Sequence, residues 1–196
     1  MRSFFILTIL ILMLFPKLVN AQQEFFGDTN GMTLSGSTNF DGLYGGGIDF
    51  YFKHNVIISG LIADYNGYNM LGAGVNFLIT GNDYNNPTKG IFGFSYTVVP
   101  DKGSLFGLNA GLVQVLNQKS NYPFSLSAIA NVTLAYGVKV VPSISYTQAF
   151  FSNKQIYPVF GLSYEIPLDR SYYSDNVSAL MVHIGLNIKL DKDTKK

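Results

Sequence analysis

The chain has 196 residues, with 13 Lys and Arg against 12 Asp and Glu, and it contains no cysteine. The near balance of charge gives no reason to expect nucleic acid or a strongly anionic partner. The lack of cysteine excludes disulfides and the thiol that lipoprotein attachment requires. Charged residues make up only 13% of the chain, against about 25% in ordinary soluble proteins.

The N-terminus has the pattern of a targeting segment. A positive start at Met1-Arg2 precedes the apolar run Phe4–Phe15, and small or compact residues follow at Val19–Ala21. The run is too short for a membrane-spanning helix, which needs about 20 apolar residues. We therefore expect a signal peptide over residues 1–21 and a single mature domain over 22–196, with an uncleaved membrane anchor as the alternative.

The rest of the chain divides into segments of about ten residues separated by Gly, Asn, Asp, Pro and Ser, the residues that turns need. No segment carries a sustained helical period. The segments predicted as strands are 42–53, 55–65, 68–80, 89–99, 104–116, 122–135, 138–149, 155–167 and 178–190.

Each segment has one apolar face and one small or polar face. In the segment 178–190 the even positions from 180 to 190 are all aliphatic, whereas the odd positions from 181 to 189 are mostly polar or small. A wet interior and an apolar exterior are typical of a transmembrane β-barrel, with a soluble β-protein as the alternative. We expect 178–190 to close the barrel and to present these side chains to lipid: Leu180, Val182, Ile184, Leu186, Ile188 and Leu190.

The number of strands follows from closure. Nine segments is an odd number, whereas single-chain bacterial barrels have even counts. Residues 31–38, in which Met32 and Leu34 alternate with Thr33 and Ser35, supply a tenth strand. The prediction is an all-β, closed antiparallel transmembrane barrel of eight to ten strands, with ten favoured. Eight would need two segments to be wrong, and Pro142 marks the weakest of them.

Aromatic residues lie mostly near the ends of these segments, where they match the girdles at lipid–water boundaries. Those expected in the girdles are Tyr44, Phe52, Tyr65, Tyr68, Tyr96, Tyr122, Phe124, Tyr136, Tyr146, Phe150, Phe151 and Tyr157.

Four features together characterise the chain: a signal peptide, the absence of cysteine, Gly- and Tyr-rich amphipathic strands, and the final segment Gly185–Leu190. In this it resembles the small outer-membrane barrels of the Bacteroidota. The resemblance implies export to the outer membrane of a Gram-negative cell. Proteobacterial barrels usually end on an aromatic residue, whereas this last strand ends at Leu190 and is followed by Asp191–Lys196.

The sequence contains few candidates for catalytic residues. His54 falls in a turn, and His183 falls on the polar face of its strand. Lipid-modifying barrel enzymes resemble one another in a His–Ser pair that faces lipid, and no serine lies two positions from His183. No His, Asp and Glu cluster has metal-ligand spacing. We predict no catalytic residue, metal or cofactor.

The polar face is expected to line the lumen. Its charged residues share one parity, which suggests a network of paired charges made of Asp49, Lys53, Lys139, Glu165, His183 and Lys189. Glycines expected on the same face are Gly45, Gly47, Gly72, Gly74, Gly93, Gly107, Gly111, Gly161 and Gly185. Because eight strands are just filled by side chains, ten leave little room, so a filled lumen is favoured over a conducting one.

These patterns favour a non-enzymatic outer-membrane barrel that acts as a structural or accessory subunit of an envelope assembly. The alternative is a narrow diffusion pore for small solutes, and a lipid-modifying enzyme is the weaker alternative. The expected partners are outer-membrane lipids and, as a second candidate, another outer-membrane protein.

Overall fold

The computed structural model describes residues 30–39, 42–52, 56–65, 68–79, 87–99, 103–134, 138–166 and 180–191. The predicted signal peptide, residues 1–21, lies outside this part of the chain and stays a prediction. Within these ranges no helix is long and apolar enough to cross a membrane.

Ten β-strands account for most of the described residues, in agreement with the favoured strand count. They are β1 (Gly31–Thr38), β2 (Leu43–Phe52), β3 (Val56–Tyr65), β4 (Tyr68–Ile79), β5 (Thr88–Val99), β6 (Gly103–Leu116), β7 (Phe124–Leu134), β8 (Val138–Ala149), β9 (Ile156–Glu165) and β10 (Leu180–Lys189). The strand that contains Pro142 is present, and Pro142 lies within β8.

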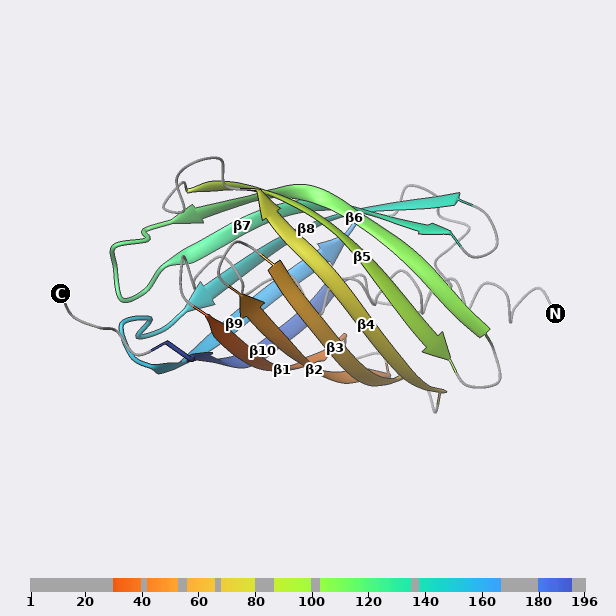
Figure 1. The fold of residues 1–196 in the computed structure, drawn as a ribbon, viewed down its shortest axis with the longest axis horizontal. Helices are drawn as coiled ribbons and strands as arrows, with labels where there is room; N and C mark the ends of the chain where they lie inside the picture. Colours follow the sequence, from red (N-terminus) through yellow and green to blue (C-terminus); the bar gives the residue numbers. More distant parts are fainter. Residues whose placement is uncertain are drawn as a thin grey trace.

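The strands form one closed antiparallel barrel in which each strand pairs with its neighbours in sequence. Figure 1 shows them strongly tilted as they wrap around the molecule, with β1 and β10 side by side. The pairing of β1 with β10 closes the sheet, and it runs from Gly31 opposite Lys189 to Thr38 opposite Val182. Closure leaves the sheet without a free edge, which a barrel in lipid requires.

Side chains at the ends of the closing strands fix this seam. The backbone N–H of Asn30 donates to Asp191 Oδ2 at 2.9 Å, and Asn30 Nδ2 donates to Asp191 Oδ1 at 3.0 Å. The N–H of Leu190 donates to the carbonyl oxygen of Asn30 at 2.9 Å. These bonds hold one register between the first and last strands.

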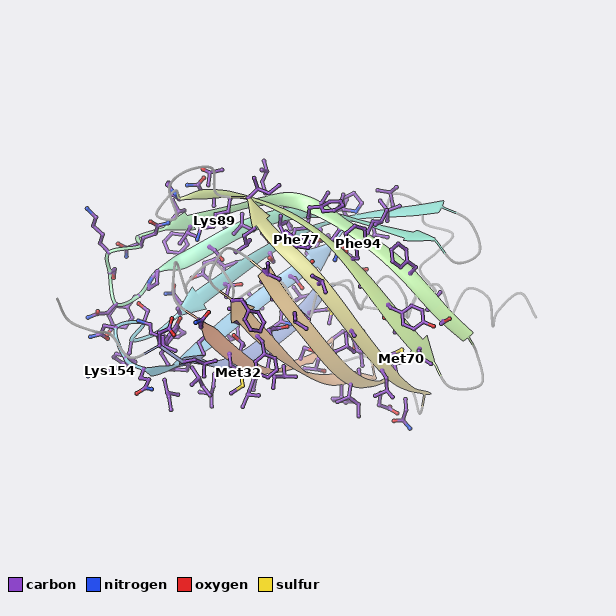
Figure 2. All side chains as sticks on the ribbon, viewed as in Figure 1. Met32, Met70, Phe77, Lys89, Phe94 and Lys154 are labelled. Atoms are coloured by element: carbon purple, nitrogen blue, oxygen red, sulfur yellow. The ribbon has the colours of Figure 1, made fainter. Side chains whose placement is uncertain are left out.

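The two faces alternate as the sequence indicates. On β10, Ile184 is 63% exposed on the outer face, while its neighbour His183 is 3% exposed on the inner face. Figure 2 shows Met32 and Phe94 pointing away from the barrel wall. The predicted lipid-facing residues are exposed or half-buried on the outer face of β10 and the residue after it: Leu180, Val182, Ile184, Leu186, Ile188 and Leu190.

The inner face is less uniformly polar than expected. Tyr51 and Ile57 form one buried apolar cluster, and Ala149, Tyr157 and Val159 form another. Tyr157 was expected in an aromatic girdle, but its side chain is fully buried on the inner face. The position of an aromatic residue near a strand end gives its height along the barrel, but the face on which it lies depends on whether its position along the strand is odd or even. Tyr157 has the same parity as Gly161 and Glu165, which lie on the inner face.

The turns at one end of the barrel pack against each other. The N–H of Ser152, after β8, donates to the carbonyl oxygen of Asn121, after β6, at 3.0 Å. The rings of Tyr122 and Phe151 lie 5.3 Å apart in an edge-on arrangement. Lys154 extends from this end, which is also where β10 finishes (Figure 2). These contacts support the rim next to the seam.

The inside-out polarity makes a direct prediction on β10. Ile184→Lys would place a charge on the apolar outer face near the middle of the strand, at a cost of about 2–4 kcal/mol in a bilayer. Gly185→Lys would place the same charge on the inner face and should be better tolerated. Heat-modifiable migration of the folded barrel on gels, after assembly in lipid vesicles, measures both. Normal assembly of Ile184→Lys would contradict the assigned polarity.

Candidate functional site

The inner face carries a row of asparagines that the strand register brings together. Asn76 of β4 lies opposite Gly93 of β5, Gly93 lies opposite Asn109 of β6, and Asn109 lies opposite Asn131 of β7. We call Asn76, Asn109 and Asn131 the asparagine row. Each is only 2% exposed, so all three amides lie inside the barrel.

The amides of this row are only partly satisfied by the protein. Asn109 Nδ2 donates to Asn76 Oδ1 at 3.4 Å. Neither amide atom of Asn131, nor the amide oxygen of Asn109, has a hydrogen-bond partner among the described residues. Buried polar groups are nearly always hydrogen-bonded, so these amide atoms are exceptions among the described residues.

Gly93 allows Asn76 to lie across the intervening strand. A Cβ atom on Gly93 would collide with the Asn76 side chain and would lie 2.8 Å from the Val75 carbonyl oxygen. The missing side chain at position 93 therefore lets Asn76 extend toward Asn109. The row depends on this glycine as much as on its three amides.

A row of small residues lies beside the asparagine row. Ser59 of β3 is opposite Gly74 of β4, Gly74 is opposite Ser95 of β5, and Ser95 is opposite Gly107 of β6. We call these four positions the glycine–serine row. A Cβ on Gly107 would approach Ser95 Oγ to 2.5 Å, so Gly107 provides the room that Ser95 occupies.

An apolar cluster lies on the opposite side of the asparagine row, toward the end of the barrel that holds β10's last residues. Its buried members are Ile91, Val113, Val115 and Ile129, and Leu78 packs against them. Leu78 also packs against the cluster of Tyr51 and Ile57, so apolar side chains continue around this part of the wall. Along the barrel, small, amide and aliphatic side chains thus follow one another.

The predicted charge network is described only in part. Asp49, Glu165 and His183 are buried on the inner face, and Lys189 is half-buried there. Tyr51 Oη donates to Asp49 Oδ2 at 3.4 Å, and the Lys189 ammonium lies 6.0 Å from the centre of the Tyr157 ring.

Two members of the predicted network cannot be placed. Lys53 lies outside the described residues, and Lys139 lies in β8 with its side chain outside the description. The pairing of the charges therefore stays a prediction.

His183 has a serine partner that sequence reasoning missed. Ser163 Oγ and His183 Nε2 lie 2.8 Å apart, both buried on the inner face. Ser163 comes from β9 rather than from β10 itself, so only the register between the two strands could have revealed it. Because the pair faces the interior, it does not have the lipid-facing geometry of lipid-modifying barrel enzymes. The described residues contain no group of three His, Cys, Asp or Glu able to hold a metal.

Lys89 was also missed as an inner residue. The predicted strand 89–99 begins at Lys89, which was not counted among the inner charges, yet it is the second residue of β5 and is 3% exposed. Its parity with Ile91 and Gly93 was the available signal. The inner face thus carries Lys89 and Lys189 as well as Asp49 and Glu165.

The outer face has an apolar groove of about 570 Å³. It crosses β6 to β10 along one register row: Leu112, Ala128, Ile144, Tyr164 and Leu180. The small side chain of Ala128 lies between Leu112 and Ile144, which are both exposed. The groove is separate from the lumen.

Comparison with known proteins supports the fold of the chain alone. No protein-family model and no curated protein matches the chain. Among solved structures, the NanC porin matches with a TM-score of 0.52 and 13% identity, over 82% of this chain and 100% of that one.

Two further structures match with lower TM-scores. The KdgM porin, in a complex with disordered oligogalacturonate, has a TM-score of 0.46 at 8% identity, over 82% of this chain and 99% of that one. The N-terminal barrel of OprF from Pseudomonas aeruginosa has a TM-score of 0.34 at 12% identity, over 82% and 96%. The chain therefore has the fold of an outer-membrane β-barrel, and the likeness to the NanC porin carries that conclusion.

The role of Gly93 can be measured through stability. Gly93→Ala should lower the free energy of unfolding by about 1–3 kcal/mol, because the new methyl group overpacks the wall against Asn76 and the Val75 carbonyl. Gly36→Ala is the matched control, since its Cβ would lie 3.7 Å from the nearest atom. Urea unfolding of the barrel in lipid vesicles measures both. Asn76→Ala should restore part of the loss, and equal stability of the two glycine variants would refute the packing role.

Proposed function

We propose that this chain forms a narrow diffusion pore for small polar solutes in the outer membrane of a Gram-negative bacterium. Unpartnered polar atoms on the inner face carry the proposal. They belong to Ser35, Ser37, Asp49, Asn109, Asn131, Thr147 and Asn187. Each would cost about 1–3 kcal/mol if left unsatisfied, so their number favours a lumen that holds water.

The dimensions of the barrel agree with a narrow pore. Ten strands about 4.8 Å apart and tilted by about 40° give a wall radius of about 10 Å. An eight-stranded barrel is just filled by its side chains, whereas this wall is wider and carries glycine and serine over part of its inner face. The apolar cluster would supply a constriction, a common element of selective channels.

The likeness to the NanC porin adds support at the level of fold. That protein is a porin, and its whole length matches this barrel. The Gly- and Tyr-rich, amphipathic style of the strands favours a source within the Bacteroidota. A pore is therefore better supported than the accessory subunit that the sequence patterns favoured.

The outer-face groove favours a second candidate function, that of an accessory subunit. Its apolar residues suit contact with lipid chains or with another outer-membrane protein. Co-purification of one defined partner from mild detergent, together with the absence of conductance, would favour this candidate over the pore.

Cysteine substitution tests the pore directly, because the chain has no cysteine of its own. Ser95→Cys places a thiol on the inner face, and Tyr96→Cys places one on the outer face, where Tyr96 is 51% exposed. In planar bilayers we expect stepwise openings from both variants. A charged methanethiosulfonate reagent should lower the conductance of Ser95→Cys and leave that of Tyr96→Cys unchanged.

The unsubstituted protein, which has no thiol to react, is the control for nonspecific effects. Mass spectrometry should verify that each cysteine has reacted. Absence of stepwise openings from the unsubstituted protein would reject the pore, as would unchanged conductance of a fully modified Ser95→Cys barrel.

A further inference from the structure

The groove on the outer face is apolar over most of its length and polar at one end. We infer that it binds one acyl chain of a phospholipid, whose ester and phosphate oxygens lie at the polar end. The inference concerns the lipid-facing side of the wall, so it goes beyond the proposed pore and does not depend on whether the lumen conducts.

Apolar side chains of two neighbouring register rows line the groove. Leu112, Ala128 and Ile144 belong to the row described above, and Leu126 and Leu162 belong to the next one. The small side chain of Ala128 leaves a gap between Leu112 and Ile144, which are 61% and 52% exposed. In a bilayer this gap faces hydrocarbon, so a chain that fills it gains van der Waals contacts that a void would lose.

Thr88 and Gln114 form the polar end of the groove. Thr88 is the first residue of β5, and Gln114 lies opposite it near the end of β6, so both lie at one rim of the barrel. The Thr88 hydroxyl donates to the amide oxygen of Gln114. Because Gln114 uses its amide oxygen in this bond, its amide nitrogen can donate to a further acceptor. A phospholipid offers such acceptors in its ester carbonyl and phosphate oxygens.

Neighbouring side chains indicate that this rim lies at the lipid–water boundary. The rings of Phe124 and Tyr146, both on the outer face, lie 5.9 Å apart. Tyr146 Oη donates to Gln148 Oε1 at 2.8 Å. Aromatic rings with a polar tip gather at the headgroup level of a membrane. The polar end of the groove therefore lies at the level of the ester and phosphate groups.

The course of the groove across the wall suits one acyl chain. From Thr88 on β5 to Leu180 on β10 it crosses five strand separations, or about 24 Å. The strands are inclined to the barrel axis (Figure 1), by about 40° in such barrels, so this path descends by about 15 Å. That depth is about half of a hydrocarbon core about 30 Å thick. A chain that starts at the rim would therefore stay within its own leaflet.

The charge and shape of the site favour a phospholipid over other occupants. Thr88 and Gln114 are uncharged, and Lys89, which follows Thr88, is buried on the inner face. The two phosphates of lipid A are better suited to Arg and Lys clusters. A second barrel has a convex wall, which fits a narrow groove poorly.

Native mass spectrometry of the folded barrel, titrated with dipalmitoyl phosphatidylethanolamine in detergent, tests the site. We expect one retained lipid per barrel. Ala128→Leu fills the gap with a side chain suited to lipid and should weaken binding at least tenfold. Ala73→Leu makes the same change on the outer face of β4, which does not line the groove, and should leave binding unchanged. Gln114→Leu removes the donor and should weaken binding by about threefold to tenfold.

Two further measurements separate a specific site from general contact with lipid. Dihexanoyl phosphatidylethanolamine, which has the same headgroup, should bind at least tenfold more weakly, because fewer CH₂ groups enter the groove. The dipalmitoyl lipid should raise the unfolding temperature of the unsubstituted barrel and of Ala73→Leu more than that of Ala128→Leu. Gel mobility of each heated and unheated variant verifies folding.

Failure to retain a lipid, or equal retention by Ala128→Leu and the unsubstituted barrel, would overturn the inference. Tighter binding of lipid A, lost in Ala128→Leu, would overturn the choice of phospholipid. Co-purification of one protein that Ala128→Leu abolishes, with no lipid retained, would assign the groove to a protein instead. Each of these outcomes is independent of conductance, so the pore and the lipid site can fail separately.

Discussion

Closure of β1 on β10 is the constraint on which the rest of the structure depends. A membrane offers no partner for an unpaired backbone N–H or C=O, so a sheet that crosses it must have no edge. Here the two closing strands are held in one register by the bonds between Asn30 and Asp191 and by the bond from Leu190 to Asn30. Once this register is set, the parity of every strand decides which side chains enter the lumen. A slip of one residue would exchange the two faces.

The lumen is built from contacts across strands that are distant in the sequence. Asn76 and Asn131 are separated by 55 positions, yet both belong to one row because the registers of β4 to β7 align them. Glycine is as important here as the polar residues. Gly93 gives Asn76 room to cross β5, and Gly107 gives room to Ser95. Polar groups without protein partners then make a dry interior costly, which links the packing of the wall to the proposed pore.

Most of the architecture could be predicted from the sequence because its main signals are local. Alternation with a period of two and the positions of turn-forming residues gave ten strands, and the observed bounds lie within about two residues of those expected. The outer position of Ile184 and the inner position of His183 followed from the same alternation. Signals of this kind need only a few neighbouring residues.

The candidate site was much less accessible to such reasoning, because it depends on register between strands. Parity places Ser163 and His183 on the same face, but only the pairing of β9 with β10 brings them to 2.8 Å. Lys89 was left out of the predicted inner charges because it stands at the start of its strand, next to the turn-forming residues. Tyr157 was expected in an aromatic girdle because it lies near the end of its strand, although its parity along the strand places it on the inner face.

No local pattern in the sequence indicates why apolar residues such as Ile91 and Val113 lie on the otherwise polar inner face. Their clustering becomes visible only in the closed barrel.

The central claim is that apolar side chains face lipid while water fills the interior. Single cysteines at Leu126, Ser127 and Ala128 of β7, each labelled with a small fluorophore in lipid vesicles, test it most directly. We expect nitroxide-bearing lipids to quench the probes at 126 and 128, and aqueous iodide to quench the probe at 127. Quenching of the probe at 127 by lipid, or its complete protection from iodide, would contradict the account.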